Sequence, residues 1–264
     1  MPRLAVLGHP VAHSRSPAMQ NAALAELGLA DEWHYEAIEV APEVFEQKVR
    51  AMAGEGFAGA NVTVPHKEAA LAVADAPSEV AKEIGAANTL VFAAGGVGAH
   101  NTDADGFLAA LPGSPGGRRA LVLGAGGAAR AVLWALEREG AEVDVWNRTT
   151  ARAERLCRQL GGTPVARPDQ VAYELIVNTS AAGLGGEDPF EHLPLRAAGF
   201  AAGQTVVDMV YGKGPSPLLR AATEAGAATV DGIEVLVQQG ALSLQIWTGR
   251  EAPVAAMRTA ARES

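Results

Sequence analysis

The chain has 264 residues, 48% of them hydrophobic and 19% charged, so it can bury a sizeable core in one large or two medium domains, and disorder is not expected. Its net charge of −9 argues against nucleic acid as a partner, and no apolar run is long enough for a membrane span or a signal peptide. The single cysteine, Cys157, excludes an internal disulfide and a multi-cysteine metal site, so we expect a reducing, cytoplasmic compartment and no bound metal.

Short apolar runs alternate with amphipathic segments over the first hundred residues, which favours an α/β fold with a parallel sheet. Ser16 and Ser78 are candidate N-caps of two of the helices, and the segment GGVGAHN at 95–101 is expected to be a turn. Strands are predicted at 3–8, 33–40, 59–64 and 88–94, and helices at 16–27, at 42–53, from Pro65 onward and at 77–86.

The run LPGSPGG at 111–117 is the clearest break in composition, and it precedes a second α/β unit. In this unit apolar strands again alternate with helical segments. Strands are predicted at 119–124, 141–147, 173–180 and 204–211, and helices at 125–140, 149–161, 232–249 and 252–263.

A glycine motif follows the first strand of this second unit and opens a helix. Gly124, Gly126 and Ala129 have the spacing G-x-G-x-x-A. The first glycine permits a tight turn, the second lets the backbone approach a pyrophosphate, and the alanine allows close packing of helix and strand. The helix N-terminus then offers N–H donors to phosphate, which predicts a dinucleotide site. The alternative is a glycine-rich turn that serves packing only.

The end of the next strand indicates which dinucleotide is bound. An NAD site places a carboxylate there, about 20 residues after the first glycine, and counting alone arrives at Asp144. Asp144, however, lies in the middle of its strand, and the strand ends at Asn147, Arg148 and Thr149. A guanidinium and a hydroxyl suit a 2′-phosphate, and Arg152 lies one helical turn further on. We therefore favour NADP; the alternative is a solvated arginine.

Two serines precede the first predicted helix. The stretch GHPVAHSRSP at 8–17 places Ser14 and Ser16 where two hydroxyls and the N–H groups of a helix end form an anion cradle. Such a cradle suits a carboxylate. The alternative is that Ser16 only caps the helix and that Ser14 is a polar loop residue.

A lysine and an aspartate are the candidates for proton transfer. Lys67 lies at the start of a predicted helix, where the helix dipole disfavours a cation, and Asp103 starts another helix. Both follow strand ends, the side on which open α/β sheets bind ligands. As a pair they would exchange a proton with a substrate hydroxyl near neutral pH. The alternatives are a solvated surface lysine and a capping aspartate.

A series of longer stretches occurs in order along nearly the whole chain: GHPVAHSRSPAMQN, NVTVPHK, GAANT, NTDADG, GAGGAAR, NRTTARA, DMVY and DGIEVLVQQGALSLQIWTG. In these stretches the chain resembles the shikimate dehydrogenase family. The resemblance implies an oxidoreductase that reversibly reduces 3-dehydroshikimate to shikimate with NADPH, on the chorismate route to aromatic amino acids.

The resemblance also assigns residues by position. Lys67 and Asp103 match the family's catalytic pair, and Ser14 and Ser16 match its binders of the substrate carboxylate. The other implied substrate contacts are Thr63, Asn88, Tyr211 and Gln239. The implied NADP contacts are Gly124, Ala125, Gly126, Gly127, Ala128, Asn147, Arg148, Thr149, Arg152, Met209 and Gly232.

The expected architecture is an N-terminal α/β substrate domain and a Rossmann-like NADP-binding domain with a cleft between them. The first would comprise 1–101 and about 236–264, since Gln239 must reach the substrate, and the second about 102–235. A monomer and a homodimer are both compatible with the sequence, and we favour the dimer. Two rivals remain: a quinate/shikimate dehydrogenase of broader cofactor use, and a non-catalytic NADP sensor.

Three segments depart from the usual pattern of the family. Gln20 stands where a histidine is usual, the segment 178–186 lacks a proline and a methionine, and 211–219 lacks an Asn-Pro pair. The two loops are expected to border the nicotinamide end of the cofactor.

Overall fold

The structure is a computed structural model that describes residues 2–264; Met1, which begins the expected first domain, lies outside the described residues. It divides into two compact units. The first takes in the chain up to Gly106 together with Leu236–Ser264, and the second is Phe107–Val235. The sequence-based division placed 102–106 with the second domain, whereas the structure places these residues with the first unit.

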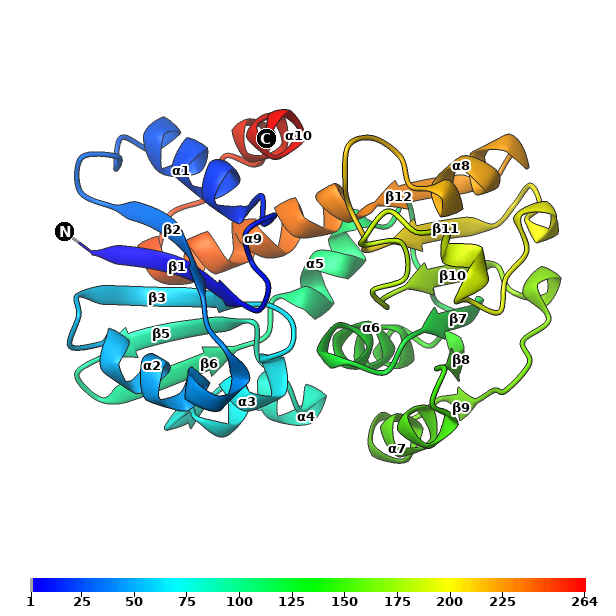
Figure 1. Cartoon of the computed structure of the whole chain (residues 1–264), viewed down its shortest axis with the longest axis horizontal. Helices are drawn as coiled ribbons and strands as arrows, with labels where there is room; N and C mark the ends of the chain where they lie inside the picture. The colour runs from blue at the N-terminus through cyan, green and yellow to red at the C-terminus, as the bar shows by residue number, and fades with distance from the viewer. Residues whose placement is uncertain (1) are drawn as a thin grey trace. The chain divides into compact units, whose positions relative to one another are not determined.

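The first unit is built on a six-stranded sheet in the order β2-β1-β3-β5-β6-β4 (Figure 1). The middle strands explain its shape: β1 is parallel to β2 and β3, whereas β5 is antiparallel to both β3 and β6. The sheet is therefore mixed: the expectation of a parallel sheet holds for β1 with β2 and β3 and for β4 with β6, and is wrong for β5. The strands are β1 (Arg3–Gly8), β2 (His34–Glu39), β3 (Phe57–Val62), β4 (Ala76–Pro77), β5 (Thr89–Ala93) and β6 (Gly96–His100).

A hairpin that the sequence analysis missed accounts for the antiparallel strands. The turn predicted at 95–101 is confined to Ala94 and Gly95, and Gly96–His100 pairs with β5 as a strand. Two-residue connections suffice for antiparallel neighbours, while parallel neighbours need a long crossover. The glycines at positions 95, 96 and 98 hid a short strand behind a turn-like composition.

Helices cover both faces of this sheet. Figure 1 shows α2, α3 and α4 on one face and α1, α9 and α10 on the other. Side chains alternate accordingly: Val62 and Leu90 belong to the apolar core that contains Phe45 and Met52 of α2. Each large apolar side chain buried there stabilises the fold by about 1.5–3 kcal/mol. The helices are α1 (Ser16–Glu26), α2 (Phe45–Met52), α3 (Lys67–Ala72), α4 (Glu79–Ile84), α5 (Asp103–Ala110), α9 (Gly232–Thr248) and α10 (Val254–Glu263), with a 3-10 turn η1 (Pro42–Val44).

The two predicted serine caps have different outcomes. The Ser78 hydroxyl accepts a hydrogen bond from Ala81 N at 3.2 Å, so this cap is confirmed. Ser16 is the first helical residue rather than the cap, so that prediction is wrong. The hydroxyl of Ser14 accepts a weak bond from Ser16 N at 3.3 Å instead.

The helix expected from Pro65 starts two residues later, at Lys67. Pro65 follows a cis peptide bond with Val64 and lies in a turn, outside the first helical turn. Lys67 is therefore the first residue of α3, at the positive end of the helix dipole as expected.

The second unit contains a fully parallel six-stranded sheet in the order β12-β11-β10-β7-β8-β9. If β7 is counted as strand 1 and the order is read from β9, it is 3-2-1-4-5-6, the doubly wound Rossmann arrangement. Its topological switch point lies between β7 and β10, at their carboxyl ends. The strands are β7 (Arg119–Leu123), β8 (Glu142–Trp146), β9 (Thr163–Pro164), β10 (Leu175–Asn178), β11 (Thr205–Asp208) and β12 (Ala228–Asp231).

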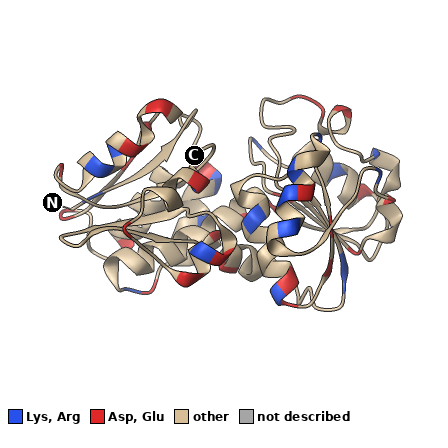
Figure 2. Cartoon of the chain, turned by 90° about the horizontal axis from the view of Figure 1, so that it is seen from below, with Lys and Arg blue, Asp and Glu red and all other residues tan. Residues whose placement is uncertain are grey.

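Three α-helices and three 3-10 turns accompany this sheet. They are α6 (Gly127–Arg138), α7 (Thr150–Leu160), α8 (Pro217–Glu224), η2 (Gln170–Ala172), η3 (Pro189–Glu191) and η4 (Ala197–Gly199). The predicted helices at 125–140 and 149–161 are confirmed with shorter ends, whereas α8, β9 and β12 were not predicted. No helix in the described part of the chain is both long and apolar enough to span a bilayer. Figure 2 shows acidic and basic residues interspersed on the helices of both units.

Candidate active site

The strand directions of the first sheet bring four chain segments to one edge, namely the edge at which β1 and β3 have their carboxyl ends. β1, β3 and β6 end at this edge, and the antiparallel β5 begins there. Backbone hydrogen bonds join the segments: His9 N donates to Val64 O at 3.0 Å, and Val62 N donates to Asn88 O at 2.8 Å. Candidate residues carried by these segments are Ser14, Thr63, Lys67, Asn88 and Asp103.

Lys67 and Asp103 form a short ion pair at this edge. Lys67 Nζ lies 2.6 Å from Asp103 Oδ2, and the side chains are only 12% and 5% exposed. Asp103 does not cap α5, because Asn101 Oδ1 accepts from Asp103 N at 3.0 Å and from Ala104 N at 3.3 Å. The Asp103 carboxylate is therefore available to hold a lysine that the dipole of α3 disfavours.

Asn88 connects this pair to helix α9. Its Nδ2 donates to Asp103 Oδ1 at 3.0 Å and to Gln239 Oε1 at 2.9 Å. Its Oδ1 accepts from Thr102 N at 2.7 Å, which fixes the orientation of the amide. Asn88 and Gln239 are both buried, so Gln239 is not a solvent-facing residue of its helix. Gly106 makes the approach possible, because a Cβ there would lie 2.6 Å from the Gln239 backbone.

The two serines follow β1, and Thr63 follows β3. Ser14 and Thr63 are half-buried, and Ser16 is buried at the start of α1. Thr63 N donates to Leu7 O at 2.8 Å, which ties the two loops together. Arg15 Nη1 donates to Ala261 O at 2.8 Å and anchors the serine loop on α10.

The glycine loop of the second unit has the geometry that phosphate binding requires. Gly124 has a φ of +123°, and a Cβ there would lie 2.6 Å from Thr179 Oγ1, so only glycine fits. Ala129 is fully buried, as close helix–strand packing requires. A Cβ on Gly126 would meet no atom of the described residues within 4 Å. The N-terminus of α6 therefore faces open space at the switch point, where a pyrophosphate fits.

The carboxylate of Asp144 already accepts hydrogen bonds from other side chains of the protein. It lies in the middle of β8, where its Oδ2 accepts from Arg119 Nη2 at 2.9 Å and from the Tyr173 hydroxyl at 2.7 Å. Burial and then the hydrogen bond to Asp144 raise the pKa of Tyr173, so this hydroxyl stays a donor. Asp144 is therefore not the ribose-binding carboxylate of an NAD site.

The end of β8 carries basic and polar groups instead. Arg148 and Arg152 are exposed, and neither forms an ion pair within residues 2–264. Asn147 Nδ2 donates to Thr149 O at 2.9 Å and closes the turn into α7. This arrangement presents guanidinium groups where an NADP site needs a 2′-phosphate contact.

Asp208 holds the segment that carries Met209 and Tyr211. The carboxylate is 1% exposed and accepts from Asn178 Nδ2 at 2.9 Å and from the Ser216 hydroxyl at 2.5 Å. Burial raises the pKa of Asp208, while these hydrogen bonds lower it. The carboxylate thus joins the ends of β10 and β11 and fixes both ends of the loop 209–216.

Two further candidates also lie in the second unit. Gly232 begins α9, and a Cβ there would lie 2.5 Å from Met209 O, so this glycine allows a close backbone approach. Tyr211 is half-buried in the second unit, whereas the other implied substrate contacts lie in the first.

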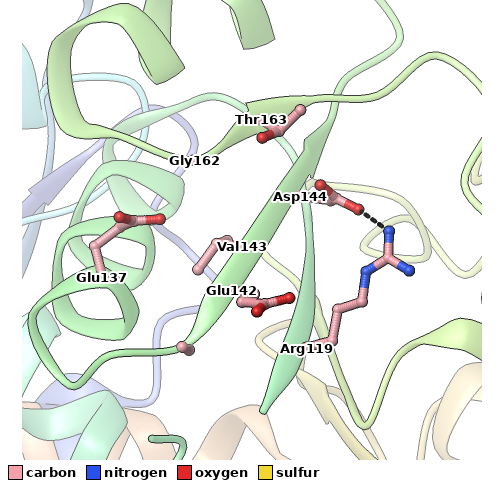
Figure 3. A pocket seen from close by; sticks show the side chains of 8 residues that line it. Arg119, Glu137, Glu142, Val143, Asp144, Gly162 and Thr163 are labelled. Atoms are coloured by element: carbon pink, nitrogen blue, oxygen red, sulfur yellow. Dashed lines mark hydrogen bonds and ion pairs between the residues drawn. The ribbon is translucent and has the colours of Figure 1, made fainter. Parts of the chain in front are cut away.

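An open pocket of about 520 Å³ lies elsewhere in the second unit (Figure 3). Its lining includes Arg119 and Glu142, the first residues of β7 and β8, so it lies away from the carboxyl ends where the glycine loop begins. Burial raises the pKa of Glu137 in its wall. None of the candidate site residues lines this pocket. We therefore place the candidate cofactor site at the carboxyl ends of the strands and not in this pocket.

The sequence analysis missed the polar residues that lie behind the Lys67–Asp103 pair. Asn61, Thr89, Thr102 and Ser243 are all buried and hydrogen-bonded to one another. The available signal was a polar residue in each of two otherwise apolar strands, at positions that face α9.

The fold and the two sites define a nicotinamide-dependent oxidoreductase with a Rossmann unit and a separate unit for its substrate. Comparison with known sequences gives the family. Residues 6–90 match the shikimate dehydrogenase substrate binding domain, 111–176 match shikimate / quinate 5-dehydrogenase, and 232–262 match the shikimate 5'-dehydrogenase C-terminal domain. The chain belongs to the shikimate dehydrogenase family, which confirms the resemblance drawn from the sequence.

Individual relatives extend over nearly the whole chain. It is 47% identical to the NADP(+) shikimate dehydrogenase of Anaeromyxobacter sp. (strain Fw109-5), covering 97% of this chain and 94% of the relative. The shikimate 5-dehydrogenase of Thermus thermophilus, crystallised with NADP(H) and shikimate, is 43% identical with a TM-score of 0.91, over 100% and 99% of the chains. A quinate dehydrogenase from Corynebacterium glutamicum in complex with NAD is 28% identical with a TM-score of 0.86, over 98% of each chain.

Proposed function

We propose that this chain catalyses the reversible NADPH-dependent reduction of 3-dehydroshikimate to shikimate. The observation that carries the proposal is the Lys67–Asp103 pair at 2.6 Å, at an edge where Asn88 also donates to Asp103. A lysine that keeps a small exposed surface and is held by a buried carboxylate is placed to exchange a proton with a substrate oxygen. The relatives that match nearly the whole chain are named for this activity.

In the proposed mechanism Lys67 Nζ donates a proton to the oxygen of the C3 carbonyl as that carbonyl is reduced, and accepts it in the reverse reaction. Asp103 holds the ammonium in place through the 2.6 Å ion pair. Ser14 and Ser16 bind the substrate carboxylate. The remaining substrate contacts are Thr63, Asn88, Tyr211 and Gln239.

The second unit fits NADP. Gly124, Ala125, Gly126, Gly127 and Ala128 would hold the pyrophosphate at the start of α6, where Gly126 faces open space. The 2′-phosphate would lie against Asn147, Arg148, Thr149 and Arg152. Met209 and Gly232 would border the nicotinamide. When bound, NADPH supplies the hydride.

Absorbance at the reduced nicotinamide band tests the proposal in four parallel reactions, with shikimate or quinate and with NADP or NAD. Reduction only with shikimate and NADP is the expected result. Comparable turnover with quinate or NAD would move the protein to the broader-specificity quinate/shikimate dehydrogenases. No turnover from folded protein that still binds NADP would overturn the proposal and favour the non-catalytic sensor, which shikimate titration would then test.

We further propose that the protein acts as a homodimer, rather than a monomer, in the cytoplasm. The cysteine content supports the compartment: a single cysteine, Cys157, can form no internal disulfide, which fits a reducing environment. Light scattering of the purified protein would test the assembly, and a mass of one chain would contradict the dimer.

A further inference from the structure

A group of buried polar side chains contacts Asn88, which in turn donates to Asp103, and the proposed mechanism does not use this group. We call Thr89, Thr102 and Ser243 the hydroxyl cluster. They are 0%, 4% and 0% exposed and come from β5, from the residue before α5, and from α9. Buried hydroxyls are costly unless they are hydrogen-bonded, so a cluster of them in a core needs a reason.

Ser243 lies at the centre of this cluster. Its Oγ is 2.8 Å from Thr89 Oγ1 and 3.1 Å from Thr102 Oγ1, and it accepts from Asn61 Nδ2 at 2.9 Å. It also donates to Gln239 O at 3.0 Å, one turn earlier in α9. One hydroxyl therefore joins a helix to strands β3 and β5 and to the start of α5.

The cluster contacts Asn88 directly. Thr102 Oγ1 lies 2.9 Å from Asn88 Nδ2, at the same range as Asp103 Oδ1 and Gln239 Oε1. Nδ2 carries two protons, so it cannot serve three acceptors fully. The Thr102 hydroxyl has Ser243 Oγ at 3.1 Å, Asn88 Oδ1 at 3.2 Å and Gln239 Oε1 at 3.4 Å within reach of its own proton. The direction of that proton therefore bears on which acceptors receive the protons of Asn88 Nδ2.

We propose that Ser243 is a positioning residue for the reaction. It orients the hydroxyl cluster so that Asn88 donates to Asp103 Oδ1 and to Gln239, which leaves Asp103 Oδ2 for Lys67. The kinetic consequence of this inference rests on the proposed function. The positioning itself is a property of the first unit and is measurable without turnover.

The test compares Ser243→Ala with Thr248→Ala. Thr248 lies on the same helix and makes the same kind of bond, to Leu244 O at 2.8 Å, but lies outside the hydroxyl cluster. For Ser243→Ala we expect kcat for shikimate to fall about 10- to 100-fold, with KM for NADP within about twofold of wild type. Thr248→Ala should keep kcat within about twofold.

The second readout is hydrogen exchange of the Asn88 side-chain amide, measured by NMR on the full chain. Exchange should be faster in Ser243→Ala and unchanged in Thr248→Ala. Wild-type kcat in Ser243→Ala, or a fall in kcat with unchanged amide exchange, would overturn the inference. A wild-type protein without turnover would instead contradict the proposed function, and the exchange comparison would still test the positioning.

A second pair of variants covers the case in which Ser243→Ala does not fold. Thr102→Val removes a hydroxyl at nearly constant volume, and Thr102→Ser keeps it. The inference requires the valine variant to lose kcat and amide protection and the serine variant to retain both. Equal behaviour of the two variants would overturn it.

Discussion

The two units of this protein build their candidate sites in different ways. In the first, the site consists of side chains, with Lys67, Asp103 and Asn88 joined by bonds of 3.0 Å or less and mostly out of solvent. In the second, it consists mainly of backbone: Gly124 and Gly126 open the turn before α6, and side chains contribute from an exposed rim. Side-chain truncations should therefore act on catalysis in the first unit and on cofactor affinity in the second.

The largest effect is expected for Lys67→Ala. Removing the ammonium takes away the proton donor, so kcat should fall about 10²–10⁴-fold, while KM for NADP changes little. Steady-state assays with shikimate and NADP provide the measurement. Lys82→Ala is the control, because Lys82 is half-exposed on α4 and its ion pair is with Glu79. A Lys67→Ala enzyme that kept most of its kcat would remove this residue from the mechanism.

In the second unit, Arg148→Ala should weaken cofactor binding and leave the chemistry intact. Loss of a charge-assisted contact to the 2′-phosphate costs about 1.5–3 kcal/mol, or about 10- to 100-fold in KM for NADP. KM for NAD, which lacks this phosphate, should not change. Arg155→Ala, on the exposed side of α7, is the matched control. Equal effects on both cofactors would argue against Arg148 as the selector.

Two glycines of the same loop separate folding from binding. Gly124→Ala forces a side chain into a φ of +123° and against Thr179, so it should lower the free energy of unfolding by at least about 1–3 kcal/mol. Gly126→Ala meets only open space and should change stability by less than about 0.5 kcal/mol. It should nevertheless raise KM for NADP about tenfold, because its methyl group projects where the pyrophosphate approaches. Denaturant titration and NADP titration of both variants test this, and unchanged affinity in Gly126→Ala would place the phosphates elsewhere.

The smallest expected effect is a pH dependence of stability in the first unit. His66 is 2% exposed, stacks on Phe45 at 4.4 Å, and donates from Nε2 to Val40 O at 2.7 Å. Burial lowers its pKa from the ordinary value of 6.5, and the charge on His9 adds to this, against the opposing hydrogen bond. The unfolded chain therefore binds the proton more readily, so stability is lost as pH falls below 6.5.

Thermal unfolding between about pH 7.5 and 5.5 would measure this dependence. The His66→Gln variant should show a shallower decrease than wild type. His13→Gln removes an imidazole from an exposed loop position and serves as the comparison. Identical pH profiles for wild type and His66→Gln would show that other groups dominate.

The two units also differ in how much of their structure the sequence predicts. In the Rossmann unit the elements from β7 to α7 follow their sequence patterns, because each apolar strand or amphipathic helix has its own periodicity and the glycine motif is local, whereas α8, β9 and β12 were not predicted. The first unit differs from the prediction at a short, glycine-rich segment, β6, which was expected to be a turn. There the antiparallel pairing with β5 stabilises a strand that its composition does not indicate.

By itself, the sequence determined the α/β class, the dinucleotide motif at Gly124, the basic end of β8 and the candidates Lys67 and Asp103. Each of these is a local pattern or one ordered set of motifs. Only the tertiary structure decided that Asp103 pairs with Lys67 rather than capping its helix, and that the Asp144 carboxylate accepts from Arg119. It also decided that Ser243 contacts Thr102, which in turn contacts Asn88. The physical reason is that hydrogen-bond partners distant in sequence are chosen by strand direction and helix packing, and a linear pattern carries neither.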